Sequence, residues 1–297
     1  MSRALFLFLI ILISCNSPSE KGGEITLVVT TTSMIADGVR AMTDSSITVV
    51  SLMGPGTDPH LFKPSKKSLD LLEEADVIVA NGLHLEGRMQ EILEKISRGK
   101  PVVFLGEYLD DADLIFPSGV QDFPDPHIWF DLSLWKKSNE FLSLQLDSLD
   151  ILNLDGSRNY IQQLDSLDSW VRKNIESIPV SNRVLLTAHD AFSYFGRAYG
   201  MEVIGLQGIS TTAEYGIKDI ENMVDLIVDR EIKAVFVESS ISSRSMEAVV
   251  QGVKRNGREV VIGGTLYSDA PGPEKSGAET YTEMVVHNVQ TLKRSLK

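Results

Sequence analysis

Three histidines and one aspartate stand in turn-rich segments of this 297-residue chain, each shortly after an apolar, strand-like run or a proline. His60 ends Gly-Pro-Gly-Thr-Asp-Pro-His, His127 follows Asp-Pro, His189 lies in Thr-Ala-His-Asp, and Asp269 follows Tyr-Ser. Three imidazoles and one carboxylate together would make a strong site for Zn²⁺ or Mn²⁺. Each imidazole binds metal only when neutral, so affinity should fall at acidic pH. From the pattern alone, a histidine after a strand is more often packed or hydrogen-bonded than a metal ligand, and an aspartate in a loop more often forms a turn.

The segments that would carry these residues alternate between β-branched apolar runs and amphipathic helical patterns. This alternation predicts an α/β fold with two lobes, each a largely parallel sheet flanked by helices. The expected strands are residues 25–30, 47–52, 77–80, 102–105, 184–187, 202–206, 234–237 and 260–263. The expected helices are residues 33–42, 65–74, 87–96, 191–199, 218–230, 245–256 and 280–295. Ligands of open α/β sheets bind beyond the carboxyl ends of strands, so a site in the cleft between the lobes is expected.

A single long helix is expected between the two halves. Apolar residues recur every three or four positions from Tyr160 to Ile178, and Pro179 ends the run. We therefore expect an N-terminal lobe over residues 25–145, a linking helical region over 146–180, and a C-terminal lobe over 181–297. A helix of ~20 residues spans ~30 Å, which is long enough to run along both lobes. Such a stiff connector predicts only modest movement of the lobes.

The N-terminus has the pattern of an export signal. Arg3 precedes an apolar run over residues 4–13, which is too short to span a membrane at ~20 residues per span. The sequence Leu-Ile-Ser-Cys ending at Cys15 resembles a bacterial lipobox. We expect residues 1–14 to be a signal peptide and residues 15–24 a tether lipidated at Cys15. The alternative is an ordinary secretory leader in which the cysteine is incidental.

Composition excludes several classes of protein. The chain has 28 Lys and Arg against 41 Asp and Glu, a formal net charge of −13, so nucleic acid is a poor partner. Its single cysteine excludes an internal disulfide framework and a four-cysteine metal site. Phosphate-binding glycine motifs and the Gly-x-Ser-x-Gly and His-Glu-x-x-His signatures are absent from the sequence, so no organic cofactor is expected.

The segments around the four candidate residues resemble the metal-binding components of bacterial ABC importers for zinc and manganese, the TroA-like or cluster A-I family. The similar blocks include residues 54–62, 125–131, 186–199 and 266–270, in the same order as in the family. The resemblance implies two α/β lobes joined by one long helix. It further implies that His60, His127, His189 and Asp269 hold one Zn²⁺ or Mn²⁺ per chain as cargo. A monomeric lipoprotein at the outer face of the cytoplasmic membrane, or in the periplasm, would then deliver the ion to an ABC permease.

Two features bear on the metal. Relatives that resemble manganese-specific proteins often carry Glu at the third ligand position, so His189 favours zinc or a protein that accepts both ions. Many zinc-binding relatives carry a His-rich insertion before the second ligand, whereas residues 110–125 contain five aspartates and no histidine. The resemblance therefore does not predict exclusive zinc binding.

Four further polar residues are candidates either to support the metal site or to have a structural role. Asp131 is a candidate to accept a hydrogen bond from the His127 imidazole, because a ligating histidine usually donates its second N–H to an oxygen. Glu214 is a candidate to reach the cleft near the metal. We expect His84 and His287 to be structural.

Two other functions remain open from the residues. An exported metal-dependent hydrolase would need Asp269 as a general base and an open coordination position. Four protein ligands would instead close a tetrahedral zinc site, which argues against an enzyme. A surface adhesin of the same fold is the third class, and no sequence repeat supports it.

Overall fold

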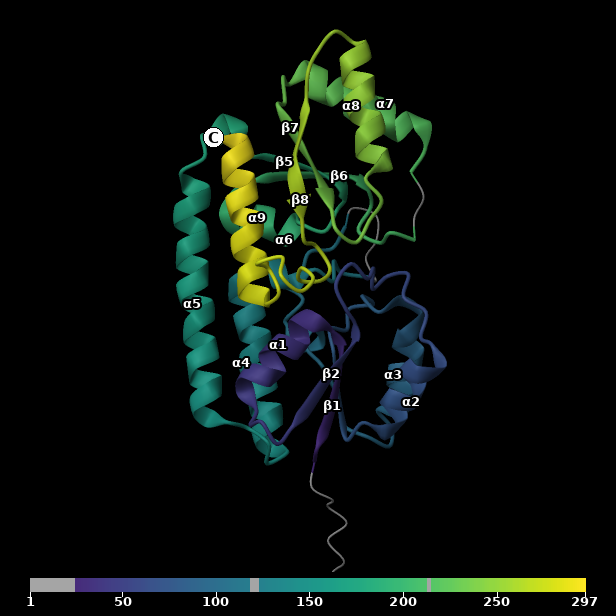
Figure 1. Cartoon of the computed structure of the whole chain (residues 1–297), viewed down its shortest axis with the longest axis vertical. Coiled ribbons are helices and arrows are strands. Elements are labelled where there is room, and N and C mark those ends of the chain that lie inside the picture. The colour runs from purple at the N-terminus through teal and green to yellow at the C-terminus, as the bar shows by residue number, and fades with distance from the viewer. Residues whose placement is uncertain (1–24, 118–122, 213–214) are drawn as a thin grey trace, which may run out of the picture.

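The computed structural model describes residues 25–117, 123–212 and 215–297. The predicted signal peptide over residues 1–14, the tether over residues 15–24 with Cys15, and Glu214 lie outside these ranges. Figure 1 shows two lobes along the long axis of the molecule. Within the described residues, no helix is both long enough and apolar enough to cross a membrane.

The N-terminal lobe is built on a four-stranded parallel sheet with the order β2-β1-β3-β4. Its strands are β1 (Leu27–Thr32), β2 (Thr48–Met53), β3 (Val77–Ala80) and β4 (Val102–Phe104). Helix α1 (Ser33–Met42) lies on one side of the sheet, and α2 (Lys66–Glu74) and α3 (Gln90–Ile96) lie on the other (Figure 1). The apolar side chains of β3 are buried throughout, as expected for a strand covered on both faces.

The C-terminal lobe contains two parallel strand pairs, β5–β6 and β7–β8, with β5 lying beside β7. The strands are β5 (Val184–His189), β6 (Glu202–Gln207), β7 (Ala234–Glu238) and β8 (Val261–Leu266). The helices are α6 (Ser193–Tyr199), α7 (Ile217–Asp229), α8 (Arg244–Arg255) and α9 (Tyr281–Leu296). Helices α7 and α8 pack on each other, and α9 packs on β8. All eight predicted strands are present, which confirms the α/β fold.

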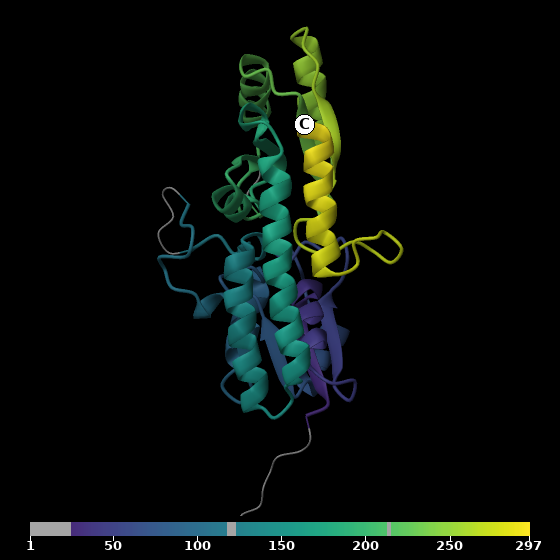
Figure 2. The same ribbon diagram turned by 90° about the vertical axis from the view of Figure 1, so that its left-hand side faces the viewer.

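Helix α5 (Leu154–Glu176) joins the lobes and runs along both of them (Figures 1 and 2). It contacts α1 and α4 (Leu132–Ser148) of the first lobe and α6 and α9 of the second. The Asn153 side chain accepts the backbone N–H of Gly156 and so caps the N-terminus of α5. Its buried stripe includes Tyr160, Leu164 and Val171, so the single long connecting helix is confirmed.

Helix α4 (Leu132–Ser148) was not predicted, and its presence corrects the sequence-based layout of the first lobe. Two polar residues, Ser138 and Asn139, are buried in its packed face and interrupt the apolar periodicity. The Asn139 side chain satisfies part of its hydrogen-bonding capacity on the Trp135 carbonyl of the preceding turn, at 2.8 Å. Tertiary packing therefore outweighs a weak local pattern here.

One buried apolar cluster continues from the first lobe across α5 into the second. Within this cluster the fully buried Trp129 donates its indole N–H to the Ser268 carbonyl of the other lobe, at 2.9 Å. The Tyr281 hydroxyl donates in turn to the Trp129 carbonyl at 2.6 Å. These contacts fix the two lobes against each other on the side of the connecting helix.

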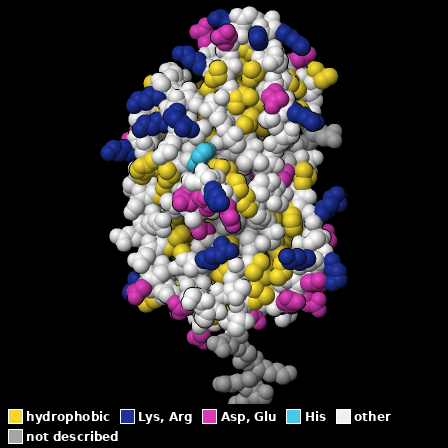
Figure 3. Space-filling view, viewed as in Figure 1, with side chains coloured by type: hydrophobic (Ala, Val, Ile, Leu, Met, Phe, Trp, Pro, Cys, Tyr) yellow, Lys and Arg dark blue, Asp and Glu magenta, His cyan; other side chains and the backbone are white. Residues whose placement is uncertain are grey.

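The molecular surface carries both signs of charge. Figure 3 shows Lys and Arg side chains intermingled with Asp and Glu on the face in view. A basic stripe, which binding to nucleic acid requires, does not occur on this face.

Candidate metal centre

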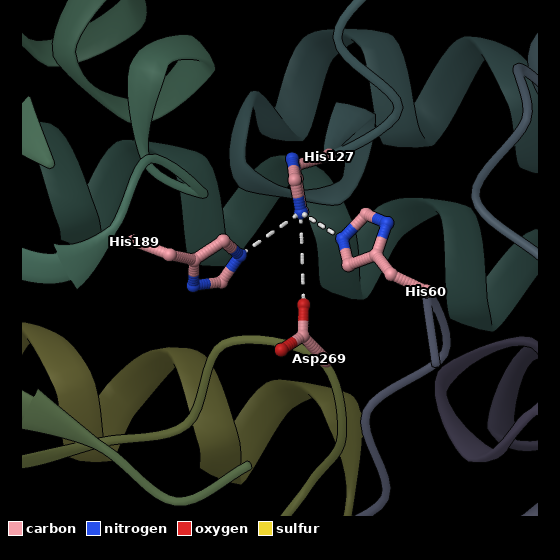
Figure 4. A group of neighbouring side chains, drawn as sticks. All are labelled: His60, His127, His189 and Asp269. Carbon is pink, nitrogen blue, oxygen red and sulfur yellow. Dashed lines mark hydrogen bonds and ion pairs between the residues drawn. The ribbon is translucent and has the colours of Figure 1, made fainter. Parts of the chain in front are cut away.

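The structure brings the four predicted metal-site residues together from both lobes (Figure 4). His60 follows β2, His127 precedes a short 3₁₀ turn, His189 is the last residue of β5, and Asp269 follows β8. The Nε2 atom of His127 lies 3.2 Å from Nε2 of His60 and 3.4 Å from Nε2 of His189. It also lies 3.7 Å from Oδ1 of Asp269, and all four atoms lie within 4.8 Å of one another.

The three distances from Nε2 of His127 are close to the ligand spacing around a tetrahedral metal ion. Zinc–ligand bonds of ~2.0–2.1 Å place neighbouring ligand atoms ~3.3 Å apart. All four side chains are buried, so the centre is largely removed from water. The structure thus contains a preformed set of three nitrogens and one oxygen aimed at one point.

Asp269 carries the clearest sign that a cation belongs there. Its Oδ2 accepts hydrogen bonds from the hydroxyls of Ser240, at 2.6 Å, and Ser268, at 2.8 Å. Its Oδ1 is buried and accepts no hydrogen bond from the described residues. A buried carboxylate oxygen without a hydrogen-bond partner is costly, and a metal ion at the cluster would remove that cost. Burial alone would raise the pKa of Asp269, but the neighbouring imidazoles, His189 first, hold it below its usual range.

The carboxylate of Asp125 orients the imidazole of His127 through Nδ1, the ring nitrogen that does not face the cluster. The imidazole Nδ1 lies 2.7 Å from Asp125 Oδ1, which also accepts the backbone N–H of His127 at 2.9 Å. An Nδ1–H that donates to this carboxylate leaves the Nε2 lone pair directed into the centre. The prediction that Asp131 has this role is wrong. Asp131 instead caps α4 by accepting the backbone N–H groups of Ser133, at 3.0 Å, and Leu134, at 3.4 Å.

His189 is held in the same way by Glu238, the last residue of the neighbouring strand β7. One Glu238 oxygen contacts the imidazole Nδ1, and the other accepts the backbone N–H of His189 at 3.0 Å. Burial alone would lower the pKa of His189, but the charge and hydrogen bond of Glu238 raise it to about 9. Sequence reasoning missed Glu238, although a carboxylate at the carboxyl end of a buried strand is a detectable signal.

His60 lies in a different electrostatic setting. Burial first, and then the neighbouring His127, lower the pKa of His60 to about 3. Its imidazole is therefore neutral over the physiological range and ready to bind metal. The carboxylate of Asp58 accepts the backbone N–H of His60 at 2.9 Å and so fixes the loop after β2. Burial raises the pKa of Asp58.

The loop that carries His127 is anchored to the end of β3. The Asn81 side chain donates to the Pro126 carbonyl at 3.0 Å. The backbone N–H of Asn81 donates to the buried carboxylate of Glu86 at 2.7 Å, and the Thr31 hydroxyl donates to the same oxygen at 2.7 Å. Burial raises the pKa of Glu86. The carboxyl ends of β1 and β3 thus support the second histidine of the site.

The other two histidines lie outside the cluster. His84 is exposed and packs edge-on against Phe123, with ring centroids 4.5 Å apart. His287 on α9 lies with its Nε2 atom 3.0 Å from the Thr265 carbonyl oxygen, and its ring packs beside Tyr267. Both have local contacts that account for their positions.

The fold has two α/β lobes joined by one long helix, and three imidazoles and one carboxylate from both lobes meet where the lobes touch. This combination defines a class of two-lobed proteins with a metal-ligand set between the lobes. The chain belongs to the family described as zinc-uptake complex component A, periplasmic, whose sequence model matches residues 28–295. It is 43% identical over 286 residues to the manganese-binding lipoprotein MntA of Bacillus subtilis, covering 95% of this chain and 93% of that protein. It is 41% identical over 278 residues to the zinc-binding protein TroA of Treponema pallidum, covering 91% and 88%. The solved structure of that periplasmic zinc-binding protein superposes with a TM-score of 0.87 at 40% identity, covering 92% of this chain and 99% of the other.

Proposed function

We propose that this chain is an extracytoplasmic binding protein that captures one Zn²⁺ or Mn²⁺ ion between its lobes and delivers it to an ABC-type permease. The observation that carries the proposal is the convergence of four buried ligand atoms, from His60, His127, His189 and Asp269, on one point. The names of its relatives, one manganese-binding and one zinc-binding, support the same cargo class.

The arrangement favours binding over catalysis. Four protein ligands complete a tetrahedral zinc shell, whereas catalytic zinc usually keeps three and one water. An enzyme would need Asp269 as a general base, but its Oδ2 is engaged by two serine hydroxyls and its Oδ1 faces the imidazoles. We therefore propose that the protein is not a metal-dependent hydrolase. A surface adhesin is the remaining alternative, and no feature of the described residues favours it.

The ligand set favours Zn²⁺ in binding affinity, but affinity alone does not determine which ion is transported. Three imidazoles and one carboxylate bind Zn²⁺ more tightly than Mn²⁺ by the Irving–Williams order. In cells, the cargo also depends on which ion is available and on the permease. Our proposal is one ion of either kind per chain.

We further propose that residues 1–14 are removed as a signal peptide and that Cys15 anchors a monomer to the membrane through the tether at residues 15–24. The relative MntA is itself named a lipoprotein. On this proposal residues 25–145 and 181–297 form the lobes, and residues 146–180 carry the connection.

Elemental analysis tests the proposal. The protein, purified without a histidine tag and dialysed against metal-free buffer, is expected to retain about one Zn or Mn per chain. His189→Ala should lose the metal, whereas His84→Ala should keep it as a matched histidine control. Failure of the wild-type protein to bind either ion on titration would contradict the proposal. Uptake of Zn²⁺ and Mn²⁺ by cells with and without the gene then identifies the cargo.

A further inference from the structure

One carboxylate connects a residue of the metal cluster to the opposite lobe. Asp58, in the loop after β2, accepts the backbone N–H of His60 through Oδ1 at 2.9 Å. Its second oxygen, Oδ2, accepts the hydroxyl of Thr211 at 2.7 Å. Thr211 lies in the segment after β6 and is 153 positions away in the sequence. The contact therefore exists only while the two lobes lie against each other.

Thr211 is in turn fixed to the strand that pairs with the one bearing His189. The Gln207 side chain donates to the Thr211 carbonyl at 2.7 Å. Gln207 is the last residue of β6 and lies opposite His189 in the parallel ladder. A continuous set of hydrogen bonds thus connects the His60 loop to the end of the strand pair that presents His189.

This contact differs from the contact between Trp129 and Ser268, which also joins the lobes. Trp129 and Ser268 are buried within the apolar core, so their hydrogen bond cannot break without disrupting that core. Asp58 and Thr211 are only partly buried, so their bond can open and close as a local event. A hydroxyl that donates to a carboxylate forms a charge-assisted bond, which is stronger than a neutral one.

We propose that the Asp58–Thr211 hydrogen bond is a latch that holds the two lobes closed over a bound metal ion. Thr211 is then a positioning residue that sets the rate of metal release without touching the metal. This inference rests on the proposed function. Because the bond forms only after the lobes meet, its loss accelerates dissociation and leaves association unchanged.

The test measures Zn²⁺ release from the purified protein into an excess of a chromogenic chelator by stopped-flow absorbance. Thr211→Val keeps the side-chain shape and removes the donor, and should release Zn²⁺ about tenfold faster. Thr211→Ser keeps the hydroxyl and should release at the wild-type rate. Thr212→Val is the matched control, because the Thr212 hydroxyl contacts only Ser210 within its own segment among the contacts of the described residues.

A double-mutant cycle identifies the partner. Asp58→Ala should release Zn²⁺ at least as fast as Thr211→Val, and the double variant should release no faster than Asp58→Ala alone. Unchanged melting temperatures of the metal-free variants would show that the effect is not a loss of folding. Release from Thr211→Val at the wild-type rate would overturn the latch, and so would release from Thr211→Ser as fast as that expected of Thr211→Val. Either result would leave the proposed function intact. Absence of Zn²⁺ binding by the wild-type protein would overturn both.

Discussion

Glu238 lies directly behind His189, with one carboxylate oxygen on the imidazole Nδ1 and the other 3.0 Å from the backbone nitrogen of the same residue. The pairing directs Nε2 of His189 toward the cluster and raises its pKa to about 9. The same partner that orients the ligand therefore also keeps it protonated at neutral pH when no metal is bound.

The first prediction follows from this protonation. Binding of Zn²⁺ at pH 7 must displace one proton from His189, since a ligating imidazole is neutral. His60, with a pKa lowered to about 3, contributes no proton in this range. The Zn²⁺ association constant should therefore rise about tenfold per pH unit from pH 7 toward pH 9 and level off above it. Calorimetric titration in two buffers of different ionisation enthalpy should find about one proton released per ion, and an affinity independent of pH would refute the assignment.

The second prediction concerns Glu238 itself. Glu238→Gln keeps the size of the side chain and removes its charge, so the pKa of His189 should fall and the pH dependence should shift to lower pH. Above pH 9, where His189 is deprotonated in both proteins, loss of this support should weaken Zn²⁺ binding about 10- to 100-fold. Glu221→Gln, at an exposed position of α7, is the matched control and should bind like the wild type. Competition titration against a chelator of known affinity measures both effects.

The third prediction separates the two aspartates near His127. Asp125→Ala should weaken Zn²⁺ binding about 10- to 100-fold, because it removes the acceptor that orients the His127 ring. Asp131→Ala should leave metal affinity nearly unchanged and lower the free energy of unfolding by about 1 kcal/mol, because it removes the cap of α4. Urea denaturation and Zn²⁺ titration of both variants give the comparison. The opposite assignment of effects would restore Asp131 as the partner of His127.

The fourth prediction concerns removal of the metal. At a free Zn²⁺ concentration about 100-fold above the dissociation constant, the folded state should gain about 2.7 kcal/mol, and a chelator should abolish this gain. His60→Ala should show a much smaller Zn²⁺-dependent rise in melting temperature, whereas His287→Ala should keep the wild-type response. Differential scanning fluorimetry with and without chelator checks this. An equal response from His60→Ala and wild type would exclude His60 from the site.

A structural element could be predicted from the sequence when the residues that specify it are neighbours in the chain. The strands were predictable because β-branched runs such as β3 are buried on both faces, and their composition records that burial directly. Helix α4 was missed because Ser138 and Asn139 occupy buried positions of its packed face. Their burial depends on neighbours that are distant in sequence.

The ligand candidates share an origin that the sequence does express, namely polar residues in turns after strands. The pairing of each ligand with its supporting carboxylate is not expressed in the sequence, even where the carboxylate itself, such as Glu238 at the end of a buried strand, is recognisable. Glu238 is 49 positions from His189 and meets it only because β7 lies beside β5, an adjacency that no local pattern specifies. Asp125 is two positions from His127, but the choice between Asp125 and Asp131 depends on where α4 begins. The missed helix and the wrong partner therefore have one cause.

The central claim is that His60, His127, His189 and Asp269 hold one metal ion. The most direct test is anomalous diffraction from crystals of the Zn²⁺-loaded protein, recorded on both sides of the zinc absorption edge. The account predicts one strong anomalous peak between the lobes, about 2.0–2.2 Å from Nε2 of each histidine and Oδ1 of Asp269. A peak bound elsewhere, or the absence of a peak between the lobes in crystals grown with Zn²⁺, would contradict it.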